Sequence, residues 1–165
     1  MTGAIGPHML RRALALVPSL ALATAALVGA RGAQACELVL SEHRVGVALK
    51  RIALPERGGA PFVSIAFEHS VLGTTVVDRY EFRPEPWLVE ERYDGYGYGL
   101  PYAAQRGERL ERLADGWRLT LERKVDPLVV RPLPAQHMRL IVGDTVLVLA
   151  SLSTHAIAFT VQGCH

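Results

Sequence analysis

The sequence predicts an all-β protein, a small antiparallel β-sandwich or partly closed barrel of about nine to ten strands. Short runs rich in β-branched and aromatic residues alternate with Gly, Pro and Asp, the pattern of strands joined by turns. Prolines recur from Pro55 to Pro134 and disfavour long helices, because proline lacks the amide proton that a helix interior needs. No linker or low-complexity tract interrupts residues 36–165, so we expect them to form a single all-β domain.

The strand pattern occurs in order along the chain. The segments are 37–42, 44–54, 61–71, 75–82, 86–94, 117–124, 127–133, 137–143, 145–151 and 155–162. Residues 104–114 have helical spacing, since Leu110 and Leu113 stand three apart. That stretch is the candidate for a helix.

The N-terminal residues predict a signal peptide. Two arginines precede an apolar run over residues 13–30, and the small residues Ala33 and Ala35 follow it. We therefore expect residues 1–35 to direct export and to be cleaved before Cys36, which gives a periplasmic or secreted protein. A retained membrane anchor is the alternative.

The exported part is close to neutral. Three of the 18 basic residues and none of the 16 acidic residues lie within residues 1–35, which leaves 15 basic against 16 acidic residues. Since no basic stripe remains, nucleic acid is not an expected partner.

Two cysteines, Cys36 and Cys164, lie at opposite ends of the exported chain. In an oxidising compartment such a pair predicts a disulfide. The alternative is a lipid on Cys36, although Ala33 stands where a lipoprotein signal usually has leucine. A redox or metal pair is not indicated, because the spacing is not C-x-x-C.

The stretch FEHSVLGTTVVDRY predicts a β-hairpin with Gly73 and Thr74 in a two-residue type II′ turn. In that register the numbers of opposed residues sum to 147, so His69 faces Asp78. The rest of their face is largely apolar: Val63, Ile65, Phe67, Val71, Val76, Tyr80 and Phe82. Two polar groups at such a place are expected to satisfy one another.

The predicted pair allows two interpretations. It is a structural polar pair that fixes the register, or, together with Tyr80, it lines one end of a ligand pocket. A hydrolytic triad is not indicated, because Ser70 points to the face opposite His69 and no G-x-S-x-G motif is present. The charge run LVEERYD, residues 88–94, is predicted to be a solvated strand face.

Glycine and tyrosine alternate in the stretch YDGYGYGLPY, residues 93–102. As a functional loop it offers Tyr96, Tyr98 and Tyr102 for stacking and backbone amides for an anion, and as a structural element it is a wide bulged turn. Its G-x-G-x-G spacing lacks the strand-to-helix context of a nucleotide site. Neither a metal nor a cofactor is expected, since the histidines are isolated from one another in the sequence.

Together these motifs resemble the domain of unknown function 1850 family of bacterial proteins. The resemblance rests on the exported N-terminus, Cys36 in the first strand, the His69-Ser70-Val71 hairpin with Asp78 on the returning strand, and Gly97-Tyr98-Gly99-Leu100-Pro101. Asp78 stands where the family usually has glutamate, and Tyr98 where it has a small residue. The resemblance implies an association with TAXI-type tripartite transporters of the TRAP class.

We therefore expect an exported, non-catalytic accessory or binding domain of an organic-anion uptake system, with a small organic anion and a membrane transporter component as partners. The expected contact residues are His69, Asp78, Tyr80, Gly97, Tyr98, Gly99 and Pro101. One alternative is a small enzyme that uses His69 and Asp78 as an acid/base pair. Another is a purely structural envelope protein.

Overall fold

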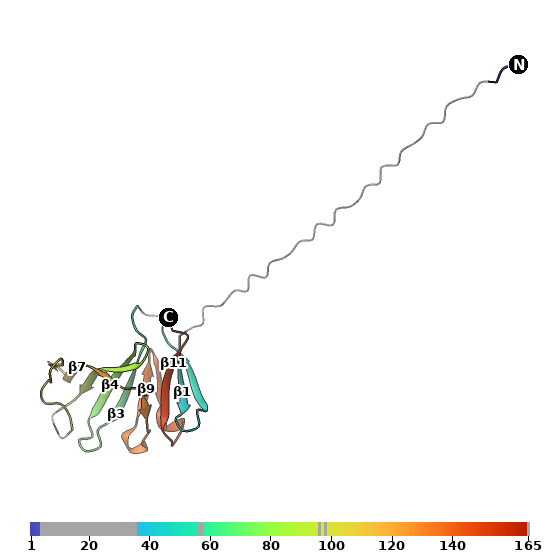
Figure 1. Cartoon of the computed structure of the whole chain (residues 1–165). Coiled ribbons are helices and arrows are strands. Elements are labelled where there is room, and N and C mark those ends of the chain that lie inside the picture. Colours follow the sequence, from blue (N-terminus) through green and yellow to red (C-terminus); the bar gives the residue numbers. More distant parts are fainter. Residues whose placement is uncertain (4–35, 56–57, 96, 98, 165) are drawn as a thin grey trace. The chain divides into compact units, whose positions relative to one another are not determined.

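The computed structural model describes residues 1–3, 36–55, 58–95, 97 and 99–164, and it is an all-β fold of two antiparallel sheets (Figure 1). The smaller sheet has the strand order β2-β1-β11-β8. Its strands are β1 (Glu37–Glu42), β2 (Ala48–Ala53), β8 (Val129–Val130) and β11 (Ile157–Gln162). The first and last strands, β1 and β11, lie side by side, as the predicted cysteine pairing requires.

The larger sheet has the order β10-β9-β3-β4-β5-β7-β6. Its strands are β3 (Phe62–Glu68), β4 (Thr75–Phe82), β5 (Pro86–Tyr93), β6 (Arg109–Leu113), β7 (Gly116–Lys124), β9 (Arg139–Val142) and β10 (Thr145–Val148). Two short 3-10 turns, η1 (Pro134–Gln136) and η2 (Leu149–Ser151), complete the regular structure of the described residues.

The core lies between the two sheets, which pack as a sandwich. Successive strand residues point to opposite faces, so one face of each sheet is apolar and can be buried. The core cluster takes Leu38, Leu40 and Phe159 from the smaller sheet and Val63 and Leu119 from the larger sheet. Each such side chain stabilises the fold by about 1.5–3 kcal/mol relative to exposure.

The prediction that residues 104–114 could form a helix is wrong, because residues 109–113 form strand β6. Leu113 pairs with Gly116 to close a hairpin, and Leu110 pairs with Leu119 of β7. The hydrogen bonds and side-chain contacts to β7 outweigh the weak three-residue spacing of the leucines. Gly107, with φ +87, precedes this strand in a conformation that does not continue a helix.

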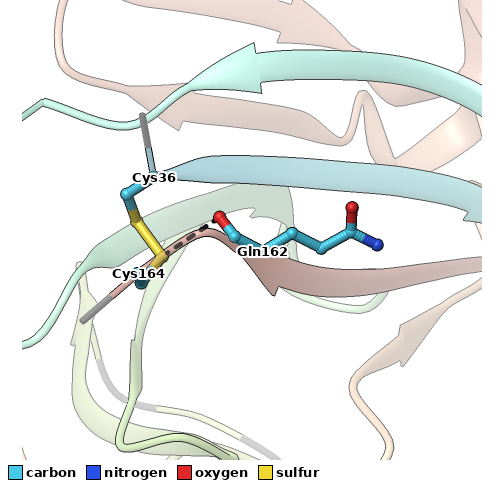
Figure 2. The surroundings of a disulfide bond; sticks show 3 residues. All are labelled: Cys36, Gln162 and Cys164. Carbon is cyan, nitrogen blue, oxygen red and sulfur yellow. Dashed lines mark hydrogen bonds between the residues drawn. A yellow bond between two sulfur atoms is a disulfide. The ribbon is translucent and has the colours of Figure 1, made fainter. Parts of the chain in front are cut away.

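Cys36 and Cys164 form the predicted disulfide (Figure 2). Their Cα atoms are 4.4 Å apart, and the bond joins residues 128 positions apart. Sγ of Cys164 also lies 3.6 Å from the carbonyl oxygen of Gln162. Because the disulfide occupies Sγ of Cys36, this residue has no thiol to accept a lipid.

The predicted signal peptide, residues 1–35, lies outside the described residues except for residues 1–3. In the portion of the chain that the structure describes, no helix is long and apolar enough to cross a bilayer.

Candidate functional site

The hairpin between β3 and β4 has a longer loop than the sequence predicts. Opposed residues have numbers that sum to 143, so Asp78 faces Ile65. The amide of His69 donates to the carbonyl of Thr74 at 2.8 Å, and the amide of Gly73 donates to the carbonyl of His69 at 2.9 Å. The prediction that His69 faces Asp78 is therefore wrong. The two residues stand four strand positions from register, roughly 13 Å at 3.3 Å per residue.

The His69 side chain explains why this longer loop forms. Its Nδ1 atom accepts the backbone amides of Val71 and Leu72, each at 3.4 Å. Gly73 then takes φ +65 at the last position of the loop, where a side chain would be strained. We name residues 69–74 the hairpin tip. His69 stabilises this turn in the way that a capping side chain does.

The observed register differs from the predicted one by four residues, since the sums of opposed residue numbers are 143 and 147. Because side chains alternate between the two faces of a strand, a shift by an even number of residues leaves each side chain on its predicted face. Val63, Ile65, Val76, Tyr80 and Phe82 are all buried on the core side. The opposite side carries Arg79, whose guanidinium contacts the ring of Phe62 and pairs with Glu81 at 3.3 Å. The prediction of which residues share a face is confirmed for the strand residues of β3 and β4, and it is wrong for Val71, which lies in the loop and is exposed.

The Gly/Tyr loop, residues 95–102, folds against the hairpin tip. A Cβ atom on Gly97 would collide with the side chain of Leu72, and one on Gly99 would lie 3.2 Å from Nε2 of His69. The hydroxyl of Tyr93 donates to the carbonyl of Pro101 at 2.6 Å. The structure thus brings His69, Gly97 and Gly99 together, because the absence of a side chain at Gly97 and Gly99 leaves room for Leu72 and His69. Tyr96 and Tyr98 lie outside the described residues.

Leu100 fixes the same loop to the core. Its side chain is buried and belongs to the cluster between the sheets. Tyr102, two residues later, is 87% exposed, and Val71 at the hairpin tip is 68% exposed. The hairpin tip and the Gly/Tyr loop therefore each expose one large side chain to solvent, while Leu100 anchors the loop in the core.

Asp78 and Tyr80 form a separate arrangement on the core side of β4. The Tyr80 hydroxyl donates to Oδ2 of Asp78 at 3.1 Å, whereas Oδ1 of Asp78 is buried without a partner among the described residues. Burial, then the charge of Glu91, raises the pKa of Asp78 to about 7, although the Tyr80 hydrogen bond and Arg123 act in the opposite direction. Burial and the Asp78 charge also raise the pKa of Tyr80.

Glu91 is the partner that sequence reasoning missed. It lies opposite Asp78 on β5. Burial raises the pKa of Glu91, Arg123 lowers it and Glu108 raises it. The run EER contained the signal, because the middle residue of three on a strand points away from its neighbours. Glu90 and Arg92 pair at 2.7 Å on the other side. The prediction of a solvated face over residues 88–94 is wrong for Leu88, Val89 and Tyr93, which are buried, because β5 lies inside the larger sheet.

This inner arrangement is suited to holding a proton. Two neighbouring carboxyl groups in a poorly solvated place cannot both ionise cheaply, so burial and the charge of Glu91 favour the protonated form of Asp78. Within the described chain, no group of three or more His, Cys, Asp or Glu side chains could hold a metal ion.

Hollows occur elsewhere on the domain. Two apolar ones, of about 260 and 460 Å³, share Phe82, Pro84 and Val161, and the larger also contacts Cys164. A third, of about 380 Å³, is lined by Glu42, Arg44, Val45, Arg131, His155 and Ala156. No sequence motif marks these arginines, because they come from segments far apart in the chain.

Comparison with known families places this small disulfide-closed sandwich in a family defined by sequence. The family model described as "Domain of unknown function (DUF1850)" matches residues 63–149, just over half of the chain. The chain belongs to this family. The match begins within β3 and includes the hairpin tip, Asp78 and the Gly/Tyr loop. Neither the curated proteins nor the solved structures contain a match.

Proposed function

We propose that this protein is an exported, non-catalytic binding domain that serves an organic-anion uptake system. Its contact surface consists of the hairpin tip and the Gly/Tyr loop. The observation that carries this proposal is the meeting of these segments, in which Gly99 packs on His69 and Gly97 on Leu72. Loops that a rigid sandwich positions in this way commonly carry binding.

Export is supported by the disulfide between Cys36 and Cys164, since such bonds persist in oxidising compartments. The transporter partner is supported by the resemblance of the hairpin and Gly/Tyr motifs to the domain of unknown function 1850 family, which implies an association with TAXI-type transporters. The exposed Tyr102 side chain suits a protein partner, because tyrosine is enriched among the residues that supply most of the binding energy at interfaces, and the exposed Val71 adds apolar surface at the hairpin tip.

The separation of His69 from Asp78 favours binding over the acid/base alternative. A catalytic pair must lie within hydrogen-bond reach of one reacting group, whereas His69 caps a turn and Asp78 contacts Tyr80 on the core side.

The test is co-purification of the full chain with the membrane component of a TAXI-type transporter from the same cell. We expect the wild type to be captured, and the double variant Val71→Ser, Tyr102→Ala to be captured at least tenfold less, since two exposed apolar contacts are lost. Val146→Ser is the matched control, because Val146 is 59% exposed on the distant strand β10. An exported wild-type protein that captures no transporter component would refute the proposal.

A further inference from the structure

The third hollow has the composition of an anion site. It lies where the turn between β1 and β2 meets the start of β11 and the end of β8. Its lining contains two guanidinium groups, from Arg44 and Arg131, and the apolar side chains of Val45 and Ala156. No motif in the sequence marks it.

The backbone around this hollow is held by hydrogen bonds. The amide of Glu42 donates to the carbonyl of Val47 at 2.9 Å, and the amide of Gly46 donates to the carbonyl of Glu42 at 2.8 Å. The amide of His43 donates to the carbonyl of Ala156 at 2.8 Å, which joins the turn to the segment that enters β11. The turn that carries Arg44 is therefore fixed in place before any ligand arrives.

The charges in the hollow are unbalanced. Neither Arg44 nor Arg131 has an ion pair or side-chain hydrogen bond among the described residues, whereas Arg83 and Arg118 on the larger sheet each contact two carboxylates. The carboxylate of Glu42 is engaged by Nδ1 of His155 at 3.1 Å. Two guanidinium groups against one carboxylate leave a formal charge of +1 before His155 is counted.

We propose that this hollow binds the carboxylate of a small organic acid. Arginine matches a carboxylate in a planar, two-bonded geometry, and a single negative charge balances the excess here. Glu42 disfavours a doubly charged phosphate by repulsion. Val45 and Ala156 provide an apolar surface for the short aliphatic chain of such an acid. The volume of the hollow, about 380 Å³, lies in the lower part of the range for small-molecule sites. The inference deepens the proposed function and rests on it for the role of the anion in the cell.

The test measures binding of butyrate, propionate, inorganic phosphate and n-butylammonium by calorimetry to protein expressed as the full chain. We expect a carboxylate to bind and n-butylammonium not to bind. Arg131→Gln and Arg44→Gln should each weaken carboxylate binding about tenfold or more, because each removes a charged hydrogen bond. The matched control is Arg139→Gln on β9, an exposed arginine that does not line the hollow.

Three results would overturn the site: no binding of either carboxylate, unchanged binding in the Arg44→Gln, Arg131→Gln double variant, or phosphate binding at least as tight as carboxylate binding. The melting temperature of each variant checks that it has folded. Val71→Ser, Tyr102→Ala should bind the carboxylate normally. In the wild-type protein, absence of transporter capture with intact anion binding, or the reverse, therefore identifies which of the two proposals has failed.

Discussion

Replacing Asp78 with asparagine will change how the stability of the protein depends on pH. In the folded protein burial and the charge of Glu91 raise the pKa of Asp78 from 3.8 to about 7. The folded state therefore keeps a proton in a range where the unfolded chain has lost it. The free energy of unfolding consequently falls as the pH rises through this range, and the loss is complete above the folded-state pKa.

The size of the effect follows from the pKa difference. A displacement of about three units corresponds to about 4 kcal/mol, of which about 2.5 kcal/mol falls between pH 5 and pH 8. These are upper limits, because the titrations of Asp78 and Glu91 are coupled and Tyr80 and Arg123 act in the opposite direction. Asparagine keeps an acceptor for the Tyr80 hydroxyl and carries no charge, so Asp78→Asn should lose this part of the pH dependence.

Urea denaturation at pH 5 and pH 8 measures the effect. The wild type should lose up to about 2.5 kcal/mol of stability between the two conditions, and Asp78→Asn clearly less. The control is Asp115→Asn, because Asp115 is exposed in the turn between β6 and β7. If the wild type and Asp78→Asn gave parallel profiles, burial would not hold the proton on Asp78 and the reasoning would be wrong.

Three further predictions concern the chain termini and the turns. Replacing Cys36 and Cys164 with serine should cost about 4–5 kcal/mol, measured by urea denaturation, because the disulfide joins residues 128 positions apart; a loss below about 1 kcal/mol would contradict this. Gly116→Ala should cost more than about 2 kcal/mol, since Gly116 has φ +145 and a Cβ atom would collide with the carbonyl oxygen of Tyr93. Gly107→Ala, with φ +87 and open space, should cost about 1 kcal/mol, and equal losses for the two glycines would remove the steric argument. Intact-mass measurement of the exported protein should give a chain that begins at Cys36 with two hydrogens fewer than the reduced form; a mass that includes residues 1–35 would refute the cleavage prediction, and the added mass of a lipid would refute the disulfide.

The candidate surface could be predicted in its parts but not in its assembly. The glycine and tyrosine alternation identified the loop, and the polar residues in an apolar hairpin identified His69 and Asp78. Sequence separation alone gave no reason for Gly99 to lie on His69, since this contact requires the sheet to bring the two loops to one place. Arg44 and Arg131 line the same hollow for the same reason.

The sequence by itself determined the all-β class, the cysteine pairing and the face to which each strand residue of the hairpin points. Those features follow from the two-residue period of a strand and from the presence of two cysteines in residues 36–165, and both are local or compositional. Only the tertiary structure decided the register, because Gly73 satisfies the conformation of a two-residue turn and of a longer loop equally well. The imidazole of His69, by accepting two amides of the loop, favours the longer one, and that choice separates His69 from Asp78 and places Asp78 opposite Ile65.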